Sequence, residues 1–329
     1  MSELPTWREL LASLVADVRE RRRIADALDL HPVTLMRWVK GESVPRPQSL
    51  WKLLAILPAK HRDMLSVALL EEFGDLSQAM SGASVEDASV IPTAFYARVL
   101  HTRANIPPAL RFSSLGDLIL HQARDLLDPY GLGLAIIVVR CMPPSADDKI
   151  HSLRESIGRG NAPWGTYLEQ QAMLLGAESL AGYAVMSGHL CVNQDLAHQS
   201  STSLGYRSTW EESAMAVPIM RASKVAGSLL VSSTQTNYFS PARIELVKSY
   251  TDLIALAFED EDFYELHTIE LRVMPSLEQQ QPYLAGFQRR VAQVIRQAAS
   301  AKKTITLVQA EQIVWQQLEQ TLLSLHYKQ

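Results

Sequence analysis

Residues 21–57 read RRRIADALDLHPVTLMRWVKGESVPRPQSLWKLLAIL, and this stretch predicts three short helices. The first helix is expected over residues 22–28. Pro32 suits the first turn of a second helix, and Gly41 suits the left-handed position that ends it. A third helix follows, with an apolar stripe at helical spacing formed by Leu50, Leu53, Leu54 and Leu57. Two short helices across a tight turn, backed by a third, form a helix-turn-helix unit.

The run LDLHPVTLMRWVKG over residues 28–41, with Pro45 and the stripe behind it, resembles the phage-repressor-like (Xre-type) DNA-binding domain. One departure is that Pro32 and Val33 stand where relatives often carry amides that read bases. The resemblance implies a small core formed by Ile24, Ala25, Leu28, Leu30, Leu35 and Trp38.

The same resemblance implies a double-stranded DNA operator as partner. Arg37 is the expected base reader, because a guanidinium can bond both major-groove acceptors of guanine. His31 and Thr34 could assist it, and Val33 could touch a thymine methyl. Lys40 lies at the exposed end of the expected recognition helix, and phosphate contacts are expected from Arg21 and Arg46.

Charge favours DNA binding over a pure protein-contact module, which a helix-turn-helix can also be. Residues 19–62 hold ten Lys or Arg against four acids, a net charge of +6. The whole chain carries −4, so the remainder carries −10. A basic region in an acidic chain is typical of a protein with a polyanion partner.

The 329 residues, 47% hydrophobic and 20% charged, indicate a soluble protein of about two domains with connecting helices. The longest apolar run, residues 132–139, is too short to cross a membrane, and the N-terminus shows no secretory signal. Cys141 and Cys191 cannot form a disulfide framework or a metal cluster. We therefore expect a cytoplasmic protein without a metal site.

Four regions are expected: a DNA-binding domain over residues 1–75, a linker with a short helix over residues 76–112, a sensor domain over residues 113–262, and a C-terminal helical region over residues 263–329. An opening helix is predicted over residues 6–19, with Thr6 as N-cap and Glu9 as its capping-box partner. Further predicted elements are helices over residues 64–73 and 94–102, and a linker over residues 74–91.

The sensor region alternates helix and strand patterns. Helices are predicted over residues 115–126 and 179–187 and from Ser240-Pro241 onward, and strands over residues 132–141, 150–157, 213–220 and 225–233. The stretches SLAGYAVMSGHLCVNQDL (179–196), ESAMAVPIM (212–220), VAGSLLVSS (225–233) and YFSPARIELVKSYTDLIALAF (238–258) resemble a GAF domain. The resemblance implies an α/β domain with an antiparallel sheet flanked by helices, so the whole chain is expected to be a multidomain α+β protein.

GAF domains bind cyclic nucleotides, tetrapyrroles, haem, amino acids or nothing, so the resemblance leaves the ligand and any cofactor open. The expected pocket residues are Trp164, Tyr183, Asn193, Asp195, Tyr206, Arg207 and Trp210, which are equally compatible with an ordinary core. His189 and Cys191 lack a bilin or haem signature and are interpreted as structural. Two cysteines without a nearby resolving partner argue against a sulfoxide-reducing enzyme.

Ile244, Val247, Thr251, Ile254 and Phe258 are spaced like a coiled-coil seam, which continues at Leu266, Ile269 and Val273. The seam favours a homodimer; alternatively, the stripe covers its own sheet. Two more helices are predicted after Pro275, the second capped by Thr306 and Gln309, and they are expected to dock on the sensor domain or on a partner subunit.

These patterns together predict a transcriptional regulator, not an enzyme, whose operator affinity responds to a small molecule. The alternative is a protein-interaction regulator in which a degenerate GAF domain serves only as a dimer scaffold.

Overall fold

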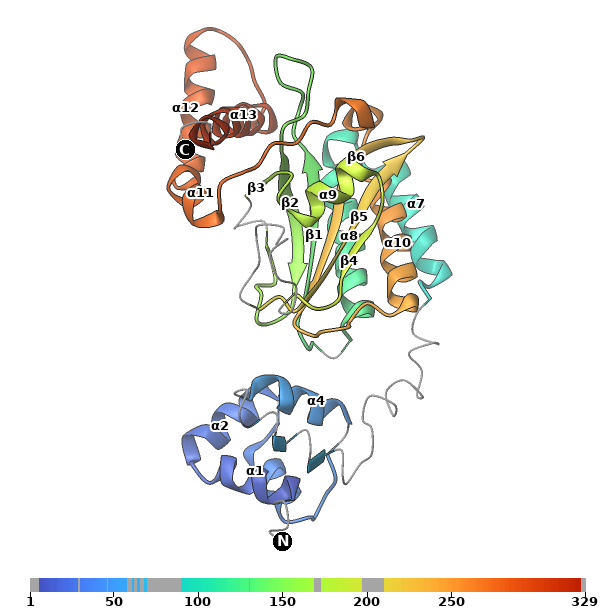
Figure 1. Cartoon of the computed structure of the whole chain (residues 1–329), viewed down its shortest axis with the longest axis vertical. Helices are drawn as coiled ribbons and strands as arrows, with labels where there is room; N and C mark the ends of the chain where they lie inside the picture. Colours follow the sequence, from blue (N-terminus) through green and yellow to red (C-terminus); the bar gives the residue numbers. More distant parts are fainter. Residues whose placement is uncertain are drawn as a thin grey trace. The chain divides into compact units, whose positions relative to one another are not determined.

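The computed structural model describes residues 6–28, 30–45, 47–57, 61, 64–65, 68–69, 90–129, 131–168, 173–196 and 210–326. The chain divides into two compact units, residues 1–90 with 128–132 and residues 91–127 with 133–329 (Figure 1). Within the described residues, no helix combines the length and the apolar character that crossing a lipid bilayer requires.

The N-terminal unit is built from short helices, namely α1 (Trp7–Val15), α2 (Val18–Ala27), α3 (Pro32–Val39) and α4 (Pro47–Ile56). The predicted capping box of Thr6 and Glu9 is confirmed. The single helix predicted over residues 6–19 is wrong, because the carboxylate of Asp17 accepts a 2.7 Å hydrogen bond from the backbone N–H of Arg19 and so begins α2. Aspartate favours such N-cap positions over helix interiors.

Helix α3 begins and ends where the sequence predicted. Pro32 lies in its first turn, and Gly41 adopts the left-handed conformation with φ +73°. The N–H of Gly41 bonds the carbonyl of Trp38 at 3.1 Å, and the N–H of Glu42 bonds that of Arg37 at 2.9 Å. This pair of bonds is a Schellman motif, which closes the C-terminal end of the helix.

One apolar core holds these helices together. Trp7 and Leu11 of α1 are fully buried beside the stripe of α4. The core positions implied by the Xre-type resemblance are buried or partly buried: Ile24, Ala25, Leu28, Leu30, Leu35 and Trp38. Of the helix predicted over residues 64–73, the structure describes helical residues at 64–65 and 68–69. The remainder of that helix, and the linker up to residue 89, lie outside the described residues.

The second unit is an antiparallel sheet between helices (Figure 1). Its strands lie in the order β3-β2-β1-β6-β5-β4, and β7 pairs with β6. Helices α7, α8 and α10 cover one face and α9 covers the other. The bounds are α7 (Thr93–Asn105), α8 (Pro108–Leu127), β1 (Leu134–Cys141), β2 (Leu153–Gly160), β3 (Leu174–Leu175), α9 (Leu180–Ser187), β4 (Cys191–Asn193), β5 (Ser213–Arg221), β6 (Lys224–Ser233), α10 (Pro241–Ala255) and β7 (Tyr264–Glu265).

Local signals located several of these elements correctly. Helix α10 begins at Ser240-Pro241 as predicted, with Ser240 as its N-cap, and Ser179 caps the predicted helix α9. The hairpin between β5 and β6 turns at Ala222 and Ser223, whose φ angles are +48° and +66°. Positive φ at both central residues matches the right-handed twist of the two strands.

The stripe on α10 was predicted with two alternatives, and the structure favours the second. Val247, Thr251, Ile254 and Phe258 are at most 2% exposed, in a core shared with α8 and the sheet. The stripe therefore covers its own sheet and is not a coiled-coil seam. Its predicted helical continuation is also wrong: after α10 come the single turns η2 (Asp260–Asp262) and η3 (Leu266–Thr268). The strand predicted over residues 150–157 is displaced, since β2 begins at Leu153 and Ile150 instead bridges Ile269.

The C-terminal region forms three helices, not two: α11 (Leu277–Leu284), α12 (Phe287–Ser300) and α13 (Leu307–His326). Gly286, at φ +82°, separates α11 from α12. The predicted cap of α13 is confirmed by reciprocal bonds between Thr306 and Gln309. Val314, Leu318 and Leu322 pack with Met142 and Leu174 of the sheet unit, so this region docks on its own chain beside β2 and β3 (Figure 1).

Candidate functional site

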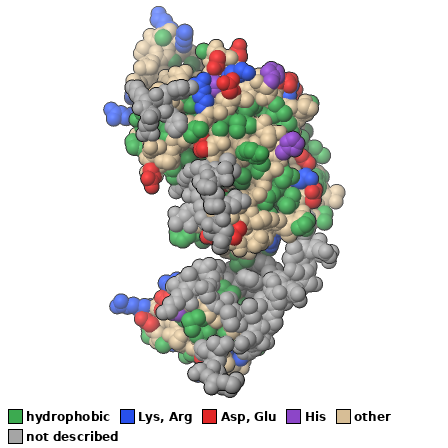
Figure 2. All heavy atoms as spheres, in the orientation of Figure 1, with side chains coloured by type: hydrophobic (Ala, Val, Ile, Leu, Met, Phe, Trp, Pro, Cys, Tyr) green, Lys and Arg blue, Asp and Glu red, His purple; other side chains and the backbone are tan. Residues whose placement is uncertain are grey.

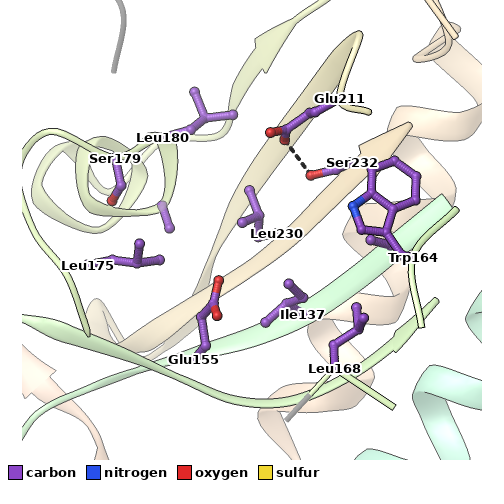
Figure 3. A pocket seen from close by; sticks show the side chains of 12 residues that line it. Ile137, Glu155, Trp164, Leu168, Leu175, Ser179, Leu180, Glu211, Leu230 and Ser232 are labelled. Atoms are coloured by element: carbon purple, nitrogen blue, oxygen red, sulfur yellow. Dashed lines mark hydrogen bonds between the residues drawn. The ribbon is translucent and has the colours of Figure 1, made fainter. Parts of the chain in front are cut away.

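A cavity of about 120 Å³ lies between the sheet and helix α9 (Figure 3). Most of its wall is apolar, and its polar groups are few. It is lined by Ala135, Ile137, Glu155, Trp164, Leu168, Leu175, Ser179, Leu180, Ala181, Glu211, Leu230 and Ser232. An apolar hollow with a small number of buried polar groups is the usual form of a small-molecule site.

A β-bulge directs Glu155 into this cavity. The pairing of β1 with β2 shifts between Val138, which opposes Ile157, and Val139, which opposes Glu155. In a regular strand Glu155 and Ile157 would share a face, because side chains alternate with a period of two. The extra residue, Ser156, lets Ile157 pack on the α8 side while Glu155 faces α9.

Two glycines of β2 leave room for the part of the cavity wall that Trp164 and Leu168 form. A Cβ at Gly158 would lie 2.9 Å from Cβ of Leu168, and a Cβ at Gly160 would lie 3.1 Å from Cβ of Trp164. Because neither glycine has a side chain, Leu168 and Trp164 can lie directly against the strand and line the cavity.

Glu155 is a buried acid with an altered protonation equilibrium. Burial raises its pKa, a backbone hydrogen bond from Met173 lowers it, and the neighbouring carboxyl of Glu211 raises it; the net pKa is about 8. At neutral pH the Glu155 carboxyl is therefore mostly protonated unless a positive charge comes near.

Glu211 reaches the cavity from the segment before β5. It is 8% exposed, and its carboxylate accepts a 2.5 Å hydrogen bond from the hydroxyl of Ser232 on β6 (Figure 3). Ser179, at the start of α9, accepts a bond of 2.9 Å from the N–H of Gly182. These contacts fix the polar groups on elements that also form the core.

The predicted pocket residues lie at several places. Trp164 lines the cavity, whereas Tyr183 and Trp210 are 52% and 54% exposed. Asn193 is buried, and its side-chain oxygen accepts a 3.2 Å bond from the N–H of Asp195. Tyr206 and Arg207 lie outside the described residues. The sequence interpretation missed Glu155 and Glu211, which stand in the polar stretches LRESIG (153–158) and WEES (210–213).

Hydrophobic side chains gather on the face of the second unit shown in Figure 2. Tyr183, Met186 and Leu190, on and just after α9, are exposed apolar side chains of this unit. Tyr183 is therefore exposed and does not belong to the described lining of the cavity.

The predicted DNA contacts on α3 and at its two caps differ in exposure and in their partners. Val33, Arg37 and Lys40 are exposed. The Arg37 guanidinium lies 3.8 Å from the carboxylate of Glu42. Thr34 is half-buried, and Nδ1 of His31 accepts a 3.3 Å bond from the N–H of Val33, so His31 caps its own helix.

Two other predicted DNA contacts lie outside α3. Arg21, on α2, donates to the sulfur of Met36 at 3.3 Å. Arg46 lies outside the described residues.

Neither cysteine is poised as a nucleophile. Burial raises the pKa of Cys141 to about 12, and burial also raises the pKa of Cys191. Thiols of this kind stay protonated at neutral pH, and the thiolate is the reactive form. Among the described residues, no group of three or more His, Cys, Asp or Glu side chains is placed to hold a metal ion.

Comparisons with known proteins bear on the second unit. The model of the GAF domain family GAF_2 matches residues 109–259. No curated protein matches the chain. Solved structures similar to it include type II free methionine-R-sulfoxide reductase from Thermoplasma acidophilum, with 15% identity, 46% of this chain and 99% of that chain covered, and a TM-score of 0.32.

Two GAF structures also match. The GAF domain of an Acinetobacter phosphoenolpyruvate-protein phosphotransferase has 16% identity, covers 50% of this chain and 89% of that chain, and has a TM-score of 0.35. The GAF region of a putative membrane protein from Geobacter sulfurreducens PCA has 21% identity and a TM-score of 0.34. The match covers 45% of this chain and 94% of that chain. The match to the family model, over a sheet and helices that enclose a cavity, shows that residues 109–259 of this chain form a GAF domain.

Proposed function

We propose that this protein is a DNA-binding transcriptional regulator whose operator affinity responds to a small molecule in the GAF cavity. The observation that carries the sensing half is the cavity itself, with two buried carboxyl groups in an apolar wall. Burying an acid away from water is costly unless something compensates for it. A ligand that places a compensating group beside these carboxyls would give them a role in sensing.

The DNA-binding half is supported by the exposed face of α3. Val33, Arg37 and Lys40 are spaced by four and three residues, so they share one side of the helix, and Leu35 and Trp38 are buried on the other. A short helix that shows basic and small apolar groups to solvent is suited to the major groove. The net charge of +6 over residues 19–62 adds attraction to phosphates.

Coupling between the two sites would follow from a population shift. A ligand that binds one conformation of the GAF domain more tightly favours that conformation, and with it one arrangement of the DNA-binding units. A homodimer would present two copies of α3 to two half-sites, as dimeric helix-turn-helix proteins do.

A selection of binding sites from a random duplex library tests this function with the full chain. We expect enrichment of a common sequence, bound with an affinity that falls steeply as salt rises, because phosphate contacts release counterions. Enrichment of no sequence, together with salt-insensitive binding, would contradict DNA recognition.

A second candidate is a protein-interaction regulator in which the GAF domain is only a scaffold. The exposed apolar side chains of Tyr183, Met186 and Leu190 favour it, since apolar groups exposed to solvent can take part in a protein contact. Under this alternative, removing the cavity's polar groups would leave regulation unchanged.

We also propose that the protein is not an enzyme of the sulfoxide-reductase kind. The raised pKa of both cysteines supports this, because that chemistry needs a reactive thiolate. Activity on methionine sulfoxide that disappears in a Cys191→Ser variant would overturn the proposal.

A further inference from the structure

We propose that the GAF cavity takes a compact organic cation, such as a protonated primary amine, with Glu155 as its counter-charge. The inference rests on the proposed sensing function of the cavity and names the chemical class of its ligand. It depends on which charges the sheet directs toward the cavity and which it directs away.

The described lining of the cavity carries acids but no lysine, arginine or histidine. Glu211 is the charged group that faces Glu155, and α9 contributes only neutral residues to the lining. The arginines of β1 and β2 have other partners. Arg140 pairs with Asp262 at 2.7 Å, Arg159 pairs with Asp117 of α8, and the guanidinium of Arg154 lies over the Trp315 ring of α13.

The shape of the cavity fits a small alkylammonium ion. Figure 3 shows the Glu155 carboxyl directed into the hollow, with Ile137, Leu175 and Leu230 around it. These apolar side chains can hold an alkyl group, and the indole of Trp164 on a further wall offers a face that attracts cations. A volume of about 120 Å³ admits only a compact ligand.

A metal ion is a poorer fit than an organic cation. Divalent metals with oxygen ligands take six or more donors, whereas the described lining supplies two carboxyl groups and two serine hydroxyls within an apolar wall. Alkyl groups bury favourably against that same wall, and an ammonium group needs only a few acceptors.

Binding of a cation must be linked to release of a proton from Glu155. Burial and Glu211 keep this carboxyl mostly protonated at neutral pH, with a pKa of about 8. A bound ammonium favours the carboxylate, so the proton leaves as the cation enters. Below the pKa, each unit of rising pH should therefore raise the affinity for the cation by up to about tenfold.

Isothermal titration of the full chain with three matched probes tests the inference. The probes are isobutylammonium, isobutanol as its uncharged analogue, and isobutyrate as its anionic analogue. An alkylamine stays protonated up to a pH of about 10, so its own charge is constant between pH 6 and pH 8. We expect the ammonium to bind at least tenfold more tightly than either analogue at pH 8, and its affinity to rise from pH 6 to pH 8.

Repeating the titration in two buffers of different ionisation enthalpy measures the proton directly. At pH 7 we expect close to one proton released per ammonium bound, and none released with isobutanol. The Glu155→Gln variant should lose at least tenfold in ammonium affinity and release no proton. The matched control is Glu319→Gln, another buried acid whose carboxylate binds Ser152 away from the cavity, and it should keep both properties.

Equal affinity for ammonium and isobutanol, absence of binding by the ammonium, or proton release unchanged in Glu155→Gln would each overturn the inference. The wild-type proton count decides it even if Glu155→Gln does not fold. Amine binding by a chain that selects no DNA sequence would overturn the regulator and keep the cation site. Sequence-specific DNA binding without amine binding would overturn the cation site and keep the regulator.

Discussion

The carboxylate of Glu319, on the last helix, accepts a 2.5 Å hydrogen bond from the hydroxyl of Ser152, just before β2. Both side chains are buried, and this bond joins the C-terminal helices to the edge of the GAF sheet. Burial raises the pKa of Glu319, while Ser152, His151 and Arg272 lower it. The docked state therefore binds a proton more tightly than the undocked state does.

This linkage predicts that docking of α13 weakens as pH rises. A carboxyl whose pKa is raised in the docked state stabilises docking below its ordinary pKa of 4.5 and loses that contribution as pH rises through the raised value. Hydrogen exchange of α13, compared at matched intrinsic rates from pH 5 to pH 8, should show falling protection. In Glu319→Gln the protection should change less with pH; an identical pH trend in the variant would contradict the prediction.

Gln280 gives the same interface a second connection. Its side-chain amide accepts from the N–H of Leu174 at 3.0 Å and donates to the carbonyls of Leu174 and Pro275 at 2.8 Å each. Gln280→Ala leaves buried backbone groups of β3 unpaired, so we expect a loss of about 2–4 kcal/mol in the free energy of unfolding. Urea unfolding measures it, with Gln281→Ala on the exposed side of α11 as control; equal effects of the two would count against the role of the amide.

Arg37 provides the sharpest test of DNA reading. We expect Arg37→Ala to weaken binding to the selected sequence by about 1–3 kcal/mol and to relax preference at one base pair. Lys248→Ala, which removes an exposed cation of α10 paired with Glu245, should leave the affinity unchanged. Fluorescence anisotropy with the selected duplex and a scrambled duplex separates the outcomes, because equal losses on both would reduce Arg37 to a phosphate contact.

Because the α10 stripe is buried in its own domain, we expect substitutions in it to lower folding stability without changing the oligomeric state. Ile254 is fully buried in the GAF core, so Ile254→Ala should lower the free energy of unfolding by about 2–5 kcal/mol. The exposed Leu100 on α7 serves as control. Leu100→Ala should change the free energy of unfolding by less than about 0.5 kcal/mol. Sedimentation equilibrium of the folded Ile254→Ala protein should show the same oligomeric state as the wild type, which we expect to be a dimer. A weaker dimer in this variant would restore the coiled-coil interpretation.

Local chemistry made part of this fold predictable. Thr6, Ser179, Ser240 and Thr306 each cap a helix that the sequence predicted, because a cap depends only on residues within one turn. Gly41 ended α3 for the same reason, since a left-handed position favours glycine.

Other features depend on distant partners and could not be predicted in this way. Spacing of apolar residues by three and four is common to a coiled-coil seam and to a helix that covers a sheet, so the stripe around Ile254 does not identify its own partner. Glu155 faces the cavity only because β2 bulges where it pairs with β1, and the register belongs to both strands together. Trp164 was found because its type suits a pocket, whereas Glu155 required the register.

The buried carboxyl of Glu155 leads to a last prediction, on stability without ligand. Its pKa is raised from 4.5 to about 8, chiefly by burial, so the folded chain binds this proton more tightly than the unfolded chain does. Stability from this group is fully present below pH 4.5 and is lost as pH rises toward 8. The difference between the two pKa values corresponds to a loss on the order of 5 kcal/mol in the free energy of unfolding of the GAF unit. Urea unfolding at steps from pH 5 to pH 8.5 should show this loss in the wild type and a much flatter profile in Glu155→Gln, which cannot ionise. Comparing the variant with the wild type at each pH cancels the contributions of the other acids. Parallel profiles for the two proteins would mean that Glu155 ionises freely, with water replacing the apolar wall around it.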